Sequence, residues 1–264
     1  MRTISVINLK GGVAKTITSA NMAHILAVIH NKRVLLVDND KQGNSSKLFG
    51  LHSYERKTVA DVMLERNLDL SAIIQKTAYK DLDMITANMN LLKANMETMF
   101  DQQRPQQTRF RKALAQVAGE YDYCIIDNAP DINISTINSL VASDDVIIPI
   151  KIDQFAFDGL AELIEQINNT REDLNSELNL AGCLITCYQN NEVNRQGEEL
   201  LRQSCYPVFK NHIRKTEKID ESTFASRPIL DYSSRSGAAR DYKRFVAEYV
   251  SETSTKEGDE IGKV

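Results

Sequence analysis

Residues 2–16 read RTISVINLKGGVAKT, and they give the strongest indication of the fold class. Its first half, Thr3–Asn8, is an apolar and β-branched run that is typical of a buried strand. Its second half is a glycine-containing loop that leads into a helical pattern beginning at Thr16. A loop of this kind turns backbone N–H groups toward one point at a helix N-terminus, where the partial positive charge favours phosphate. The stretch therefore predicts an anion site within an α/β unit.

The side chains of this loop fit a nucleotide-phosphate site. Gly11 and Gly12 let the backbone approach an anion without a clashing Cβ. Lys15 is placed to bridge the outer phosphates of ATP, and the Thr16 hydroxyl is placed to ligate Mg²⁺. The residues expected to contact the nucleotide are Lys10, Gly11, Gly12, Val13, Ala14, Lys15, Thr16 and Ile17.

The loop departs from the general GxxxxGK[ST] pattern, because Leu9 and Ala14 occupy its two glycine positions. It fits the variant KGGxGK[ST], which has a second lysine, Lys10, at its start. In this it resembles the deviant P-loop ATPases, which include ParA-type partition ATPases, MinD-type ATPases and the nitrogenase iron protein. The resemblance implies that Lys10 reaches the nucleotide of a dimer partner, while Lys15 serves its own. Ala14 would disturb the loop only if its φ is positive.

A second motif, VLLVDNDKQGN at residues 34–44, places two carboxylates directly after an apolar strand. Carboxylates at this spacing can reach the γ-phosphate, its metal and the attacking water. The motif resembles the family pattern DxDPQGN, which implies that Asp40 orients or activates the water. Asp38 would then organise the metal shell. Lys41 stands where the family usually has proline.

A third motif, YDYCIIDNAP at residues 121–130, is an apolar strand that ends in Asp127. This is the Walker B arrangement, in which the carboxylate holds Mg²⁺ through water opposite Thr16. Of the usual DxPP, only Pro130 is kept. In open α/β sheets ligands bind beyond the carboxyl ends of the strands, so the three motifs should converge. We predict catalytic roles for Asp40, Lys10 and Lys15, and metal-site roles for Thr16, Asp38 and Asp127.

Short β-branched or aliphatic runs alternate along the chain with longer helical patterns. Strands are expected at Thr3–Asn8, Val34–Asp38, Asp83–Thr86, Tyr123–Asp127, Val146–Ile150 and Leu180–Cys187. Helices are expected at Thr16–His30, Gln107–Gly119, Ile134–Ala142, Phe157–Thr170, Gln196–Gln203 and Ser236–Val250. This alternation is typical of a mostly parallel, twisted sheet with helices on both faces. We predict an α/β fold, with a single P-loop NTPase domain over residues 1–250 and a flexible polar tail over residues 251–264.

Further segments favour the ParA branch of the family. ASDDVIIPI at residues 142–150, FAFDGL at 155–160 and RPILDYSSRSGA at 227–238 resemble ParA patterns. The polar tail lacks the membrane helix of MinD-type proteins, and the four cysteines match neither the nitrogenase iron protein nor a CxxC cluster carrier. Because few residues precede the loop, we expect the short, Soj-like form of ParA.

A net charge of −4 over 264 residues argues against a protein that coats nucleic acid with its whole surface. A local basic excess remains, because residues 202–218 hold five Lys or Arg against the single acid Glu217. Short ParA proteins bind double-stranded DNA non-specifically, and Lys218 stands where the Soj-like family has a DNA-contacting arginine. The candidate DNA contacts are Arg202, Lys210, Arg214, Lys215, Lys218 and Arg235.

The resemblance implies a nucleotide-driven cycle. Monomers bind ATP and Mg²⁺, form a homodimer, bind DNA, and separate after hydrolysis that a ParB-like adaptor stimulates. We expect a cytoplasmic protein that associates with the nucleoid when ATP is bound. No apolar run approaches the roughly 20 residues that span a bilayer, so we expect no membrane partner.

Three other functions stay open at this stage. The same mechanism could position a protein assembly instead of DNA, because the adaptor defines the cargo. A P-loop phosphotransferase, such as a tyrosine autokinase or a ligase, shares the loop, although residues 251–264 contain no tyrosine cluster. Finally, Ala14 and Lys41 are compatible with a nucleotide-binding scaffold that hydrolyses little ATP.

Overall fold

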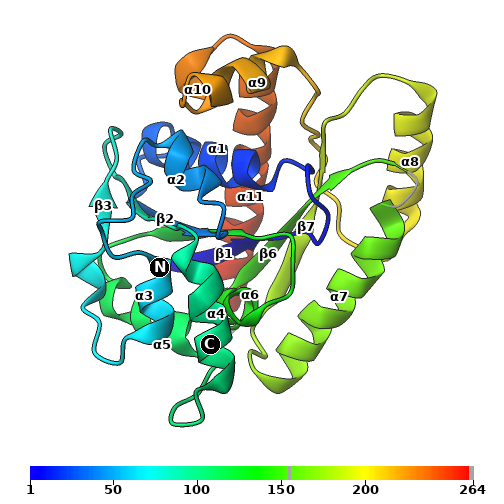
Figure 1. The fold of residues 1–264 in the computed structure, drawn as a ribbon. Coiled ribbons are helices and arrows are strands. Elements are labelled where there is room, and N and C mark those ends of the chain that lie inside the picture. Colours follow the sequence, from blue (N-terminus) through cyan, green and yellow to red (C-terminus); the bar gives the residue numbers. More distant parts are fainter. Residues whose placement is uncertain (154–155, 262–264) are drawn as a thin grey trace.

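The computed structural model describes residues 1–153 and 156–261 and has one seven-stranded sheet, shown in Figure 1. Its strand order is β3-β4-β2-β5-β1-β6-β7, and each neighbouring pair is parallel except β3 with β4. The strands are β1 (Arg2–Val6), β2 (Val34–Asn39), β3 (Gln75–Lys76), β4 (Leu82–Ile85), β5 (Tyr123–Asn128), β6 (Asp145–Lys151) and β7 (Asn179–Thr186). The predicted α/β class with a mostly parallel sheet is confirmed.

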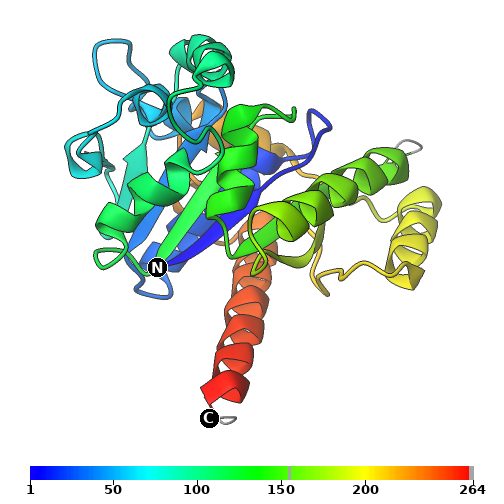
Figure 2. The ribbon, with the colours of Figure 1, turned by 90° about the horizontal axis from the view of Figure 1, so that it is seen from below.

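Helices cover both faces of this sheet (Figures 1 and 2). The α-helices are α1 (Lys15–Val28), α2 (Asn44–Leu48), α3 (Val59–Leu64), α4 (Asn90–Phe100), α5 (Arg109–Leu114), α6 (Ile134–Ala142), α7 (Ala156–Asp173), α8 (Glu192–Gln203), α9 (Glu217–Phe224), α10 (Ile229–Tyr232) and α11 (Gly237–Ile261). Two 3₁₀ turns, η1 (Leu70–Ala72) and η2 (Ala115–Val117), complete them. Helices α1, α10 and α11 pack on one face, and α3 to α7 pack on the other.

The alternation of side chains along each strand explains the two layers. On β2, Val34 and Leu36 face the cluster of α1 and α11, whereas Leu35 and Val37 face the cluster of α3, α4 and α5. Strands that are buried on both faces must be apolar throughout, which is why these runs are visible in the sequence. The fold thereby fixes β1, β2 and β5 as neighbours at the centre of the sheet.

The C-terminal prediction needs correction. The polar composition of residues 251–264 predicts a flexible tail, but α11 continues as a helix to Ile261 (Figure 2). Its first turns are anchored by buried residues such as Tyr242 and Tyr249, and extending a formed helix gains one hydrogen bond per residue. The Thr253 hydroxyl also donates to the Tyr249 carbonyl at 3.0 Å. The remainder of the predicted tail, residues 262–264, lies outside the described residues.

Helix α1 contains a buried histidine that gives the fold a pH dependence. His24 is 3% exposed, and burial lowers its pKa from the ordinary 6.5 to about 4. Between these values the unfolded chain binds more protons than the folded one, so stability falls as the pH drops from about 6.5 to 4.

We expect His24→Phe to remove this dependence, because Phe keeps the edge contact with the Tyr79 ring, whose centroid lies 4.4 Å away. Urea unfolding at pH 7 and 4.5 should show the variant losing less stability, by up to about 1.4 kcal/mol per pH unit. The control His212→Phe, a ring stacked on Tyr188 at 3.9 Å, should behave like the wild type. An unchanged slope in His24→Phe would contradict this assignment.

Candidate nucleotide site

The loop between β1 and α1 is open on the side that would meet a ligand. A Cβ added to Gly11 or Gly12 would meet no atom within 4 Å, and Gly12 has a φ of 72°. The other side of the loop is anchored, since Val13 is buried and its carbonyl accepts the Thr186 hydroxyl at 3.0 Å. Ile17 is partly buried against the core beneath α1. The loop thus presents its backbone outward from a fixed base.

Lys15 begins α1 and is a buried residue, 8% exposed. Its Nζ donates to the Lys10 carbonyl at 2.8 Å. Burial lowers the pKa of Lys15, while the charges of Asp127, Asp40 and Asp131 oppose that change. A helix N-terminus favours an anion, and the positive charge of Lys15 there makes this a favourable position for a phosphate group.

Ala14, the departure from the family glycine, has a φ of 63° and a ψ of 29°. This is the left-handed region, in which the Cβ of an L-residue is crowded and which glycine adopts readily. The conformation is retained because Ala14 caps α1, and its carbonyl accepts the Thr18 N–H at 2.9 Å. The loop therefore keeps the shape that glycine would take, at some cost in stability.

We expect Ala14→Gly to stabilise the protein by about 1 kcal/mol, because it relieves that crowding. Chemical denaturation with and without an ATP analogue would measure the effect. Gly50, at a φ of 68°, offers the inverse control, and Gly50→Ala should destabilise by a similar amount. Loss of stability in Ala14→Gly would show that the alanine methyl group makes a favourable contact.

Lys10 lies at the other end of the loop. Its backbone N–H donates to Asn8 Oδ1 at 2.9 Å, and its Nζ pairs with Asp153, which follows β6. The Lys10 side chain is 35% exposed, in contrast to buried Lys15. The two lysines of the loop thus have different environments, one inside the site and one at its rim.

Asp38 and Asp127 are register partners at the ends of β2 and β5, and both are buried. Asp127 accepts the Ser45 hydroxyl at 2.7 Å and the Ser19 hydroxyl at 3.2 Å, and it also accepts the Thr16 hydroxyl. Burial raises the pKa of both carboxyl groups, and for Asp38 the neighbouring Asp127 charge adds to the effect. A cation among these hard oxygen ligands would lower that electrostatic penalty.

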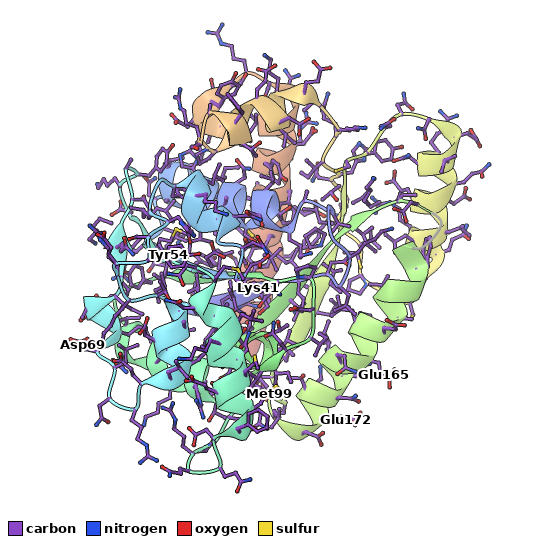
Figure 3. The ribbon with its side chains drawn as sticks, viewed as in Figure 1. Lys41, Tyr54, Asp69, Met99, Glu165 and Glu172 are labelled. Atoms are coloured by element: carbon purple, nitrogen blue, oxygen red, sulfur yellow. The ribbon has the colours of Figure 1, made fainter. Side chains whose placement is uncertain are left out.

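Asp40 completes the site just beyond β2. Its backbone N–H donates to Asp38 Oδ1 at 3.2 Å, and its own Oδ1 accepts the Gln42 N–H at 2.9 Å. Lys41, which stands where the family usually has proline, forms an ion pair with Asp131 at 3.2 Å. Lys41 is labelled near the centre of the view in Figure 3, and its ion pair links the loop after β2 to the loop after β5.

Sequence reasoning missed several partners of these carboxylates. The Ser46 hydroxyl and backbone N–H both donate to Asp38 Oδ2, at 2.7 and 2.8 Å. Ser45 and Ser46 directly follow the second motif, so their position was a usable signal. Asp153 was also accessible to the strand-end argument, because it follows a strand next to β1.

The candidate DNA residues fall into two groups. Arg202 pairs with Glu198 at 2.8 Å, Arg214 with Asp241 at 2.6 Å, and Lys218 with Glu221 at 2.6 Å. In contrast, three exposed side chains have no ion pair within the described ranges 1–153 and 156–261, namely Lys210, Lys215 and Arg235. The segment that holds Lys210 and Lys215 runs along α11, because Glu248 accepts the Lys210 N–H at 2.6 Å.

In the described part of the chain, no three His, Cys, Asp or Glu side chains gather closely enough to hold a metal by themselves. Among the same residues, no helix is long and apolar enough to cross a membrane. The first residue of the FAFDGL segment, residue 155, lies outside the described residues.

A phosphate loop between a central parallel strand and a helix, facing acidic strand ends, defines the chain as a P-loop NTPase. The model of the family described as "AAA domain" matches residues 1–180. The chain is 35% identical over 242 residues to the sporulation initiation inhibitor protein Soj of Bacillus subtilis (strain 168), covering 90% of this chain and 94% of Soj. We conclude that the chain belongs to the ParA/Soj-type family of P-loop ATPases, which confirms the resemblance seen in the sequence.

Two further comparisons agree. The chromosome-partitioning ATPase Soj of Treponema pallidum (strain Nichols) is 32% identical over 253 residues, which cover 94% of this chain and 97% of that protein. Among solved structures, cobyrinic acid a,c-diamide synthase from Mycobacterium smegmatis, with bound ATP analog and magnesium, has a TM-score of 0.79. Its sequence is 28% identical, with 94% of this chain and 93% of that one covered.

Proposed function

We propose that this protein is an ATP-driven dimeric switch for partitioning DNA. In this proposal the chain binds ATP and Mg²⁺, pairs with a second copy, and in that state binds duplex DNA without sequence preference. The observation that carries the proposal is the meeting of Lys15, Asp40 and Asp127 at the carboxyl ends of adjacent central strands. Two of the relatives described above are Soj proteins, which supports the same reading.

The nucleotide phosphates would lie against the open side of the loop, and the Lys15 ammonium group would bridge the outer phosphates. Mg²⁺ would be held by Thr16 and, through water, by Asp127, with phosphate oxygens completing its shell and Asp38 organising it. The absence of a three-ligand protein cluster in the described residues fits an ion that shares its ligands with a nucleotide. When bound, the ion neutralises charge on the phosphate oxygens.

Hydrolysis would then depend on Asp40 and Lys10. Asp40 would orient the attacking water, since it directly follows β2 and lies two residues past Asp38. Lys10 would act on the nucleotide of the partner copy, because its side chain is directed to Asp153 at the rim and not toward its own buried site. Loss of the γ-phosphate would remove a ligand shared by both copies, and the dimer would separate.

DNA binding is assigned to the exposed basic residues around the beginning of α11. Lys215 and Arg235 lie close to that helix end, because the neighbouring Arg214 is bonded to Asp241 of α11. Arg202 and Arg214 would hold this surface in place, since both are already bonded within the chain. The exposed face of α7, which carries Glu165 and Glu172 (Figure 3), would repel DNA from that side.

The double variant Lys215→Glu, Arg235→Glu is expected to weaken ATP-dependent duplex binding by about tenfold or more. Losing two phosphate contacts should also reduce the slope of log K against log salt by about 2. Fluorescence anisotropy at several salt concentrations measures both quantities. The control Lys93→Glu, an exposed lysine on α4, should leave both unchanged. Equal affinity and slope in the double variant would place the DNA surface elsewhere.

The cellular part of the proposal follows from the cycle. A cargo-bound, ParB-like adaptor would stimulate hydrolysis, and a cytoplasmic pool of monomers would exchange with dimers on the nucleoid. ATP turnover by purified protein, with and without Mg²⁺ and DNA, tests the first step. Turnover that requires a small acceptor molecule and ignores DNA would favour a phosphotransferase or ligase.

A further inference from the structure

The strand ends that carry the carboxylates also carry two asparagines. Because side chains alternate along a strand, Asn39 faces the opposite side of the sheet from Asp38 and Asp40. Asn39 on β2 and Asn128 on β5 are register partners, and they are 0% and 1% exposed. We call these two side chains the amide pair.

The amide pair joins the three central strands. Asn39 Nδ2 donates to Asn128 Oδ1 at 2.8 Å, which connects β2 to β5. Asn128 Nδ2 donates to the carbonyls of Val6 and Ile126, both at 3.3 Å, which extends the connection to β1. The strands that bear the phosphate loop, Asp40 and Asp127 are therefore linked behind the nucleotide site.

Asn39 also holds both ends of the segment that follows Asp127. At the start, the Ala129 N–H donates to the Asn39 carbonyl at 3.4 Å. At the end, Asn39 Nδ2 donates to the Ser135 carbonyl at 3.1 Å, in the first turn of α6. Ser135 is fixed from another direction as well, because its N–H donates to Asn95 Oδ1 at 3.2 Å. Asn39 of β2 thus forms hydrogen bonds to both ends of residues 129–135.

One buried oxygen of the amide pair lacks a hydrogen-bond donor among the described residues. Asn39 Oδ1 is buried and accepts no hydrogen bond from any described residue. A buried acceptor without a donor is unfavourable, and native structures rarely retain one without a reason. A rearrangement of residues 129–135 that supplied a donor would therefore be favoured.

We propose that the amide pair is a positioning device, which couples residues 129–135 to Asp40 and so sets the geometry for hydrolysis. This inference rests on the proposed function, because it assigns a role within ATP turnover. In this role Asn39 and Asn128 act through their neighbours and do not contact the nucleotide or the attacking water. Their removal should therefore lower turnover and leave nucleotide binding nearly intact.

The test uses Asn39→Leu, Asn128→Leu and the double variant, since leucine keeps the branched shape of asparagine, although it is larger, and removes its hydrogen bonds. Each single variant leaves a buried partner unsatisfied, whereas replacing both partners with apolar groups can be nearly neutral for stability. We expect the double variant to recover stability but to keep a loss in kcat of about tenfold to a hundredfold. ATP affinity should stay within about threefold of wild type, in line with a positioning role.

Asn88→Leu is the matched control. Asn88 is also 0% exposed, its Nδ2 donates to the Ser53 carbonyl at 2.7 Å, and its Oδ1 accepts the Asn90 N–H at 2.9 Å. These partners lie outside residues 129–135, so the loss of Asn88 should lower stability and preserve kcat. Recovery of kcat together with stability in the double leucine variant would overturn the proposal, because it would show a purely structural role.

Amide hydrogen exchange provides a readout that does not need turnover. In the wild type, a slowly hydrolysed ATP analogue should protect residues 129–135 as well as the phosphate loop. In Asn39→Leu, protection of the phosphate loop should remain and that of residues 129–135 should be lost. Equal protection of both segments in the variant would refute the coupling. A wild type that binds the analogue without hydrolysing ATP would instead refute the proposed function, and the exchange result would still decide the amide pair.

Discussion

Asp40→Ala is expected to lower kcat for ATP hydrolysis by about 10²–10⁴-fold, the range typical of a lost general base. The physical reason is that Asp40 lies beyond the buried pair Asp38 and Asp127, where a water would attack the γ-phosphate. ATP binding should persist, because Lys15 and the loop backbone are unchanged. The ATP-bound dimer should consequently accumulate on DNA. Phosphate release and DNA retention, measured on the same sample, check both expectations.

The control for this variant is Asp40→Asn, which retains an oxygen that can accept the Gln42 N–H. It should lose turnover as severely as the alanine variant while keeping the loop shape. Full activity in Asp40→Asn would show that the carboxylate shapes the loop and does not act on water.

Lys10→Ala is expected to abolish ATP-dependent dimerisation and to lower turnover by about 10³–10⁵-fold, as for a cationic group supplied in trans. Nucleotide binding by the monomer should change little, since Lys15 remains. Light scattering with a slowly hydrolysed ATP analogue measures dimerisation, and equilibrium titration measures nucleotide affinity.

Lys151→Ala serves as the control for Lys10→Ala, because it removes an exposed positive charge at the end of β6, two residues before Asp153. It should dimerise and hydrolyse ATP like the wild type. If Lys10→Ala dimerised normally and bound DNA with ATP, the trans role of Lys10 would be wrong.

The central strands could be predicted, and candidate site residues could be named at their ends, because the signals are local. A strand buried on both faces must be a continuous apolar run, and a phosphate loop must have small residues and a lysine at fixed spacing. Lys15, Asp38 and Asp127 follow directly from those constraints. Ala14 is predicted from the sequence to disturb the phosphate loop only if its φ is positive. In the structure the φ of Ala14 is 63°.

Other features depend on contacts that a single sequence does not reveal. The two-residue strand β3 and the short helices α2, α3, α9 and α10 were missed, because short elements carry too little periodicity. The 11-residue α4 was missed because exposed Leu92, Met96 and Phe100 obscure the apolar stripe of its buried face. The amide pair requires the register of β2 with β5, and the Arg214–Asp241 ion pair requires α11 to lie beside the segment before α9. The helix beyond residue 250 was missed because helical propagation from an anchored end leaves no apolar stripe.

The most direct test of the central claim is the molar mass of the wild-type protein in solution with ADP, and with a slowly hydrolysed ATP analogue and Mg²⁺, with and without duplex DNA. The account predicts a monomer with ADP, a dimer with the analogue, and salt-sensitive DNA binding by the dimer alone. A monomer that binds the analogue fully but neither dimerises nor binds DNA would contradict the account.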